Sequence, residues 1–284
     1  MHELSEVKLK RLQECELIIA NEVKRICNKK KISYFLIGGS LLGEIRHKGF
    51  IPWDDDMDIG FLREDYERFC RECETELSEG FVFQTWDTDE GYPFSFGKIR
   101  LSGTHIEEQF APNDTRLDGI YVDIFPFDNA PDSLVKRKMH ATRIFVLRRI
   151  LWMKKGYGTC IKEEGIKQHV KYNLFKVFSM FWPYTHTKNR LKKVLSQYDK
   201  VKTRLITFDG VYPYMKNTFL REWLGALPEY EFEGLQLCAP ENYDDFLKQT
   251  FGDYMMLPPI EERRSHGIKS VSFGDYYSSG LTEK

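Results

Sequence analysis

Apolar residues recur every three to four positions through several segments of the chain, which is the spacing of an amphipathic helix. The first segment spans residues 3–30, where one apolar stripe is flanked by Lys, Arg and Glu side chains. Its lysine triplet Lys29–Lys31 is typical of a helix C-terminus. The same periodicity predicts helices over residues 3–30, 41–46, 63–77, 133–154, 163–181, 190–200 and 242–249.

Shorter segments rich in β-branched and aromatic residues predict strands. They lie at residues 33–37, 56–61, 81–86, 92–101, 104–110, 119–125 and 231–238. The segments 92–101 and 104–110 flank Gly103, so we expect them to pair with each other around that glycine. Helices and strands are interspersed without an internal repeat, which indicates an α+β fold with mixed elements.

A Gly-Gly-Ser sequence follows the first predicted strand. Gly38 and Gly39 end that strand, and Ser40 stands where the N-cap of the helix 41–46 is expected. A strand, a glycine turn and a helix N-terminus bring free backbone N–H groups to one point, which is an arrangement that binds phosphate. A glycine pair alone is more often only a turn.

Four aspartates come soon after this turn: Asp54, Asp55, Asp56 and Asp58. On a strand over 56–61, side chains two residues apart share a face, so Asp56 and Asp58 project together. Asp54 joins them if the strand begins early, whereas Asp55 points away. So much negative charge in a short segment is costly unless solvent or a cation neutralises it.

Asp123 is the one charged residue in the apolar strand 119–125, where a carboxylate is costly unless it is paired or binds a metal. Carboxylates without a nearby His or Cys suit Mg²⁺ or Mn²⁺ better than zinc. Such ions neutralise a diphosphate and align attack on phosphorus. A calcium-binding EF-hand loop beginning at Asp54 is excluded, because it places Ile59 where Gly is needed and Asp65 where Glu is needed.

Charge is unevenly distributed along the chain. The chain has 284 residues, of which 42% are hydrophobic, and a formal net charge of −1. Residues 133–204 nevertheless hold 19 Lys and Arg against 3 Asp and Glu. With aromatic residues on its predicted helices, this basic block favours contact with an anionic membrane surface. A plain helical cap and a nucleic-acid surface are the alternatives, and we expect no nucleic acid.

The six cysteines form no recognisable disulfide framework. Cys70 and Cys73 are a single CxxC within the helix 63–77, which we interpret as ordinary thiols. The N-terminal segment is charged and lacks an apolar core, so we expect no signal peptide, and no apolar run is long enough to predict a membrane span. The expected location is therefore the cytoplasm, with peripheral attachment at the inner face of the plasma membrane if the basic block binds lipid.

Four segments resemble the LicD family, which is named for bacterial phosphocholine transferases and has fukutin and the fukutin-related protein as distant animal relatives. The longest is GGSLLGEIRHKGFIPWDDDMDIGF at residues 38–61. The others are GKIRLSGT at 97–104, GIYVDIFPFD at 119–128 and FGDYMMLPPIEERRSH at 251–266. The resemblance is good before residue 130 and in the C-terminal segment, and poor in the basic block.

This resemblance implies a nucleotidyltransferase-like core in which helices flank a mixed β-sheet. We therefore expect a catalytic core at 1–130, a basic helical lobe at 131–204 and a C-terminal segment at 205–284 that packs back on the core. The implied reaction is metal-dependent transfer of phosphocholine from CDP-choline to a hydroxyl of a cell-surface glycan, with release of CMP. The acceptor would be teichoic acid, lipopolysaccharide or a capsule precursor, including lipid-linked oligosaccharides.

The resemblance also implies roles for individual residues. Asp56, Asp58 and Asp123 match the catalytic, metal-binding acids, and the strand argument adds Asp54 as a metal ligand. Asp123 is either a ligand or the base that accepts the acceptor proton. The residues expected to contact the donor are Gly38, Gly39, Ser40, Arg46, Lys48, Lys98, Arg100 and His266.

Three alternatives remain open on the sequence. The first is a donor that carries ribitol or glycerol, as CDP-ribitol or CDP-glycerol, with the chemistry unchanged. The second is an inactive, membrane-associated scaffold, although the intact Asp56, Asp58 and Asp123 argue against that. Nucleotidyl transfer to RNA or to an antibiotic uses the same fold but lacks the long motif at 38–61.

Overall fold

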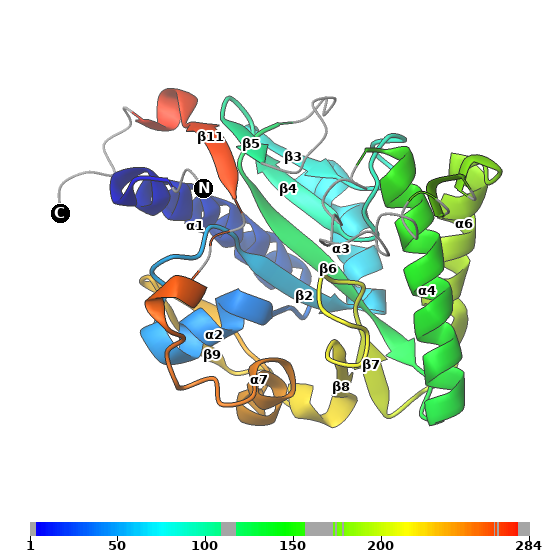
Figure 1. The fold of residues 1–284 in the computed structure, drawn as a ribbon. Helices are drawn as coiled ribbons and strands as arrows, with labels where there is room; N and C mark the ends of the chain where they lie inside the picture. Colours follow the sequence, from blue (N-terminus) through cyan, green and yellow to red (C-terminus); the bar gives the residue numbers. More distant parts are fainter. Residues whose placement is uncertain are drawn as a thin grey trace.

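The computed structural model describes residues 4–108, 118–156, 173, 175–177, 179–263, 265 and 267–277. Its helices are α1 (Glu6–Lys30), α2 (Gly38–His47), α3 (Arg63–Glu76), α4 (Leu134–Lys154), α6 (Tyr184–Leu195) and α7 (Tyr243–Phe251) (Figure 1). The Ser5 side chain caps the start of α1 by accepting a hydrogen bond from the Lys8 amide, and Lys31 ends the helix in the left-handed conformation. The helix predicted at 163–181 lies mostly outside the described residues.

A mixed β-sheet forms the centre of the molecule. Its strands are β1 (Phe35–Leu36), β2 (Asp58–Leu62), β3 (Phe81–Gln84), β4 (Gly97–Leu101), β6 (Tyr121–Ala130), β7 (Leu205–Thr207) and β8 (Thr218–Leu220). They are arranged in the order β1-β2-β6-β4-β3, while β7 pairs with the second half of β6 and with β8. Only the β2–β6 pairing in this sheet is parallel. The predicted mixed sheet flanked by helices is therefore confirmed.

The two faces of this sheet are covered by different helices. On one face, Phe61 of β2 stacks on Phe69 of α3, and α1 packs beside α3 (Figure 1). On the other face, Phe127 of β6 lies near Phe246 of α7, which stacks on Phe219 of β8. Alternation along the strands separates the two sets, since Phe61 is level with Pro126 and the next residue, Phe127, points the opposite way. The burial of these aromatic rings holds helices and sheet together.

Helices α4 and α6 form a lobe with its own small apolar cluster. Leu147 and Leu151 of α4 pack with Leu191 and Leu195 of α6, apart from the main core. Figure 1 shows this lobe beside the sheet, near the end of β6 where β7 pairs. Within the described ranges, no helix has both the length and the apolar character needed to cross a bilayer.

The predicted hairpin of 92–101 with 104–110 is wrong. β4 pairs with β3 and β6, whereas β5 (His105–Glu108) pairs with the distant β11 (Ile268–Ser272). The Thr104 hydroxyl donates to the Leu101 carbonyl and accepts from the Ile120 amide. The Thr104 side chain thus occupies backbone hydrogen-bonding groups that a hairpin would need. The chain turns out of the sheet at Gly103, which has a φ of +76°.

Two further predictions of elements need correction. The single strand predicted at 231–238 is a hairpin of β9 (Glu229–Phe232) and β10 (Leu235–Cys238). Glu233 and Gly234 both have positive φ, as the two-residue turn of a hairpin requires. The helix predicted at 190–200 is α6, which begins six residues earlier and ends at Leu195.

Candidate active site

The glycine turn lies directly against the aspartates. A side chain at Gly39 would overlap the Oδ2 atom of Asp54, and one at Gly38 would come 3.0 Å from Oδ2 of Asp58. Gly38 also has a φ of +56°, which favours glycine. Both glycines are thus explained by the close approach of carboxylates to the start of α2.

The start of α2 differs from the sequence prediction. The helix begins at Gly38 with Ile37 as N-cap, and Ser40 is inside it, so Ser40 is not the N-cap. Its hydroxyl instead accepts a hydrogen bond of 2.8 Å from the Asp58 amide. Ser40 thereby fixes the start of β2 beside the helix N-terminus, where unpaired N–H groups and the helix dipole favour anions.

The aspartates are in a tight loop that leads into β2. This strand begins at Asp58 and not at Asp56, so the predicted strand start is two residues too early. Met57 still contacts β6, since its carbonyl accepts a hydrogen bond of 2.9 Å from the Asp123 amide. The shared face of Asp56 and Asp58 stays a prediction. Asp54 and Asp55 are buried, Asp56 and Asp58 are half-buried, and the side-chain amide of Gln13 donates to the Asp54 carbonyl from α1.

Asp58 meets Asp123 across the parallel pair of β2 and β6. The two residues are register partners, and strand spacing puts their backbones about 5 Å apart. On the other side of β6, Lys98 of β4 is level with Asp123 and forms an ion pair of 2.8 Å with it. Burial raises the pKa of Asp123 to about 6, and Lys98 opposes this shift. Three adjacent strands therefore bring together three residues predicted from separate motifs.

Lys98 is enclosed by aromatic rings. Its Nζ atom is 3.2 Å from the ring centroid of Tyr121 and 5.7 Å from the centroids of Phe94 and Phe96. Cation–π attraction and the ion pair with Asp123 both fix the ammonium group here. The charge is thus positioned beside the acids, where a phosphate group also needs it.

Two residues near the aspartates were missed by sequence reasoning. Glu16 of α1 is 2% exposed, and its pKa is raised well above the usual range by burial and then by the four nearby aspartates, Asp56 foremost. Tyr212 approaches from the loop after β7, and burial, then Asp54, Asp56 and Asp58, raise its pKa. Glu16 did leave a signal, since it lies among the mostly apolar residues that form the buried stripe of the first helix.

Of the basic residues predicted to contact the donor, Arg46 lies near the aspartate loop, together with Arg263. Arg46 donates to the Tyr254 carbonyl at 2.7 Å, and the guanidinium of Arg263 stacks on Trp53, next to Asp54. The pKa of Arg46 is lowered by burial and by Arg263, which indicates that the two cations are neighbours. They give the loop a positive rim, although only Arg46 was predicted.

The structure does not place the other residues predicted to contact the CDP-alcohol beside the glycine turn and the aspartates. Lys48 is exposed at the C-terminal end of α2, about 15 Å along the helix axis from Gly38. Arg100 is buried, and it donates to Gln84 at 2.8 Å and to the Gly119 carbonyl at 2.7 Å. His266 lies outside the described residues.

A second missed network joins the site to the lobe. Asp209 accepts from the Ser95 hydroxyl and from Arg148 of α4, both at 2.6 Å. Arg148 also donates to the Gly210 carbonyl at 2.7 Å. These contacts tie α4, the loop after β7 and the segment Phe94–Phe96 together.

The side chains around the aspartate loop determine which metal ion could bind there. Among the described residues, no group of three His, Cys, Asp or Glu side chains converges closely enough to hold an ion. Mg²⁺, however, commonly takes one or two carboxylates and completes its shell with water and substrate phosphates. Asp58 and Asp123 provide such a pair, and Asp54 and Asp56 add further oxygens nearby. The donor set therefore fits Mg²⁺ or Mn²⁺ held jointly with a phosphate ligand.

The sequence is similar to one family model and to several known proteins. Residues 31–149 match the family model described as LicD/FKTN/FKRP, nucleotidyltransferase domain. The chain is 29% identical over 270 residues to the lipopolysaccharide cholinephosphotransferase LicD of Haemophilus influenzae, covering 92% of this chain and 97% of that protein. It is 56% identical over 96 residues to the ribitol 5-phosphate transferase FKRP of Mus musculus, covering 34% of this chain and 17% of that protein. An uncharacterized protein of Rickettsia typhi is 36% identical over 69 residues, covering 23% of this chain and 22% of that protein.

Proposed function

Because the chain belongs to the LicD family and is a LicD-like phosphotransferase, we propose that it transfers phosphocholine from CDP-choline to a glycan hydroxyl and releases CMP. The name of the Haemophilus influenzae relative, which aligns over nearly its whole length, supports choline and a lipopolysaccharide-type acceptor. The name of FKRP supports ribitol phosphate as the alternative group. CDP-ribitol is therefore the rival donor, and CDP-glycerol tests a smaller polyol.

One observation carries this proposal: the Gly38–Gly39 turn is packed against the carboxylates of Asp54 and Asp58. A helix N-terminus binds phosphate oxygens, and carboxylates bind the cations that accompany phosphates. Asp54, Asp56, Asp58 and Asp123 would hold Mg²⁺ or Mn²⁺ together with the donor diphosphate. When bound, the ion neutralises phosphate charge and polarises the phosphorus that is attacked.

The residues around this point have complementary tasks. Backbone N–H groups at the start of α2 orient the diphosphate, and Lys98 stabilises negative charge on the transferring group. The acceptor oxygen forms a bond to the phosphorus next to the alcohol, the bond from that phosphorus to CMP breaks, and CMP leaves with the bonding electrons. Asp123 receives the hydroxyl proton or acts only as a metal ligand.

Asp123→Asn distinguishes these two roles. If Asp123 is the base, the variant binds Mg²⁺ and CDP-choline nearly as tightly as the wild type but loses turnover by a factor of about 10² or more. If it is a ligand, metal-dependent donor binding itself is lost. Calorimetry separates the outcomes, and Asp58→Asn is the reference for a lost ligand.

The proposal is tested by release of CMP. Purified protein is supplied in turn with CDP-choline, CDP-ribitol and CDP-glycerol, with Mg²⁺ or with a chelator, in the presence of lipopolysaccharide oligosaccharide. We expect CDP-choline to be consumed fastest and the chelator to abolish turnover. Faster use of CDP-ribitol would transfer the proposal to that donor. If all three donors stay intact, the proposed transfer reaction is wrong.

We also propose that the lobe attaches the protein to an anionic membrane surface. Apolar side chains on α4 stand in water, among them Val135 at 69% and Met139 at 62% exposure. Lys136 and Lys138, which are exposed as well, lie between these two residues in the sequence. Beyond α4, Phe181 is 81% exposed. Apolar side chains flanked by lysines suit the boundary between lipid tails and acidic headgroups.

Liposome sedimentation tests this location. Vesicles with phosphatidylglycerol should retain the protein at low salt and release it at high salt, whereas phosphatidylcholine vesicles should bind little. Met139→Glu should weaken binding, while Val7→Glu, at an exposed apolar position on α1, should not. Equal behaviour of the two variants would contradict a membrane role for α4.

A further inference from the structure

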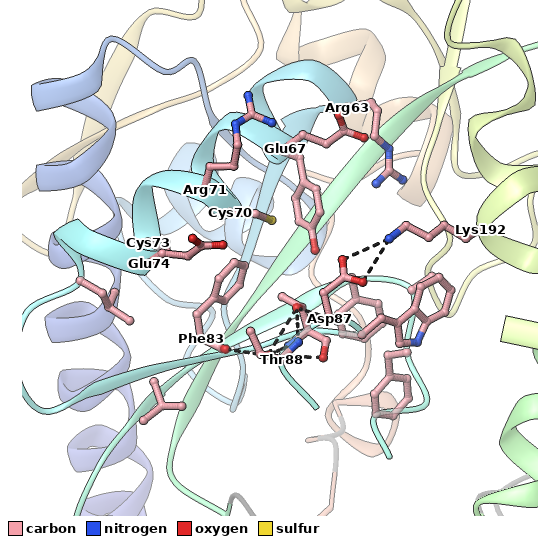
Figure 2. Close-up of a pocket in the computed structure, with 18 of the residues that line it drawn as sticks. Arg63, Glu67, Cys70, Arg71, Cys73, Glu74, Phe83, Asp87, Thr88 and Lys192 are labelled. Carbon is pink, nitrogen blue, oxygen red and sulfur yellow. Dashed lines mark hydrogen bonds and ion pairs between the residues drawn. The ribbon is translucent and has the colours of Figure 1, made fainter. Parts of the chain in front are cut away.

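A crevice of about 650 Å³ lies between the core and the lobe, and the segment Phe94–Phe96 is part of its lining. Figure 2 shows its walls, which are α3, the strand β3 with the loop that follows it, and the end of α6 that carries Lys192. An ion pair of 3.1 Å between Lys192 and Asp87 joins the lobe to the core across it (Figure 2). The volume is typical of pockets that hold an organic ligand.

Aromatic side chains provide much of the lining surface. Tyr66 and Phe83 are almost fully buried, and Trp86, Phe94 and Phe96 are half-buried. Aromatic rings on this surface can pack against the C–H faces of a ligand.

The rim carries equal numbers of opposite charges. Arg63, Arg71 and Lys192 line the crevice together with Glu67, Glu74 and Asp87. Two of the cations are already paired, Arg63 with Asp128 of β6 and Lys192 with Asp87. Because Asp128 does not line the crevice and neutralises Arg63, the rim keeps a small negative excess, which disfavours an anion such as a free phosphate. It does offer many hydrogen-bond donors and acceptors to a neutral ligand.

The crevice shares a wall with the candidate active site. Phe94 and Phe96 line it, and their ring centroids are each 5.7 Å from the Lys98 ammonium that pairs with Asp123. Phe94 and Phe96 are stacked on each other, and Ser95 between them is held by Asp209. The crevice is therefore next to the candidate active site, with these two rings in common.

We propose that the crevice binds neutral sugar units of the acceptor glycan, at a distance from the hydroxyl that reacts. Sugar rings present a C–H face to aromatic side chains and an edge of hydroxyls to charged ones, which is the combination that floor and rim provide. That the sugars belong to the acceptor rests on the proposed transfer reaction. Sugar binding itself does not depend on it.

Two matched variants test this site. Glu67→Trp places an indole over the crevice from the exposed side of α3, and Glu64→Trp places the same residue one turn away, outside the lining. In the transfer assay, Glu67→Trp should raise the KM for lipopolysaccharide oligosaccharide about tenfold or more, with kcat and the donor KM changed less than about twofold. Glu64→Trp should match the wild type, and circular dichroism should show both variants folded.

A binding measurement separates this proposal from the transfer reaction. Saturation-transfer NMR is recorded without donor on oligosaccharide released from lipopolysaccharide by mild acid. We expect sugar signals with the wild type and Glu64→Trp, and their loss with Glu67→Trp, even if no CDP-alcohol is ever consumed. Equal sugar signals from all three proteins would overturn the proposal. A second result would also overturn it: the wild type binds lauric acid but no sugar, and Glu67→Trp abolishes the binding of lauric acid. The crevice would then hold an acyl chain.

Discussion

Glu44 lies on α2, one turn beyond the glycines and Ser40, and its side chain is buried. It is 2% exposed, and neither carboxylate oxygen has a hydrogen-bond partner among the described residues. Burial raises its pKa from 4.5 to about 9. The folded protein therefore holds this carboxyl group protonated at neutral pH, whereas the unfolded chain ionises it.

The sign and size of the effect follow from proton linkage. Between pH 4.5 and about 9 the folded state binds one more proton at Glu44 than the unfolded state, so stability falls as pH rises. The slope is about 1.4 kcal/mol per pH unit, which gives about 3 kcal/mol between about pH 5.5 and 7.5. Glu44→Gln keeps the shape and has no proton to lose, so this loss should disappear.

Urea unfolding at several pH values measures the difference. The stability of Glu44→Gln relative to the wild type should increase by about 3 kcal/mol from about pH 5.5 to 7.5, and other titrating groups cancel in this comparison. Glu231→Gln, at an exposed position of β9, should run parallel to the wild type. If Glu44→Gln also runs parallel, the carboxyl group is not held neutral and the reasoning from burial is refuted.

Three further perturbations are informative. Lys98→Met removes the cation that opposes the raised pKa of Asp123, so the acidic limb of the pH–rate profile should move up by about one pH unit or more, and an unmoved limb would contradict the ion pair. Gly39→Ala drives a methyl group against Asp54, so calorimetry should find CDP-choline binding with Mg²⁺ weakened about tenfold or more, and unchanged affinity would argue against the glycine turn as the donor site. Burial lowers the pKa of His140 below 6.5, so thermal stability should fall as pH drops below about 6.5, by up to about 1.4 kcal/mol per pH unit, until the folded-state pKa is reached. His140→Gln should lack this dependence, and an identical pH profile would show that the buried imidazole does not cause it.

Much of the site was predictable because its chemistry is local in sequence. Gly38, Gly39 and Asp58 are within one motif, and Asp123 was conspicuous as a charge in an apolar strand. Their meeting follows from strand order, since β2 and β6 are neighbours in register. Glu16 was overlooked because amphipathic periodicity averages over a stripe, and one acid within it changes the pattern little.

Strand pairing was harder to predict than strand existence. β5 has the expected β-like sequence, yet its partner β11 lies near the other end of the chain. Local pattern cannot identify such a partner, and the hydroxyl of Thr104 blocks the nearer one. The hairpin at Glu233 and Gly234 was missed for a related reason, because glutamate seldom marks a position with positive φ.

The chain leaves the main sheet at Ala130 and returns to it at Leu205, and these two residues are register partners in neighbouring antiparallel strands. The segment between them therefore begins and ends at the same place in the sheet. We expect that a change in its length leaves the order of the strands unchanged, so that one wall of the crevice can vary while β6 keeps Asp123 in place.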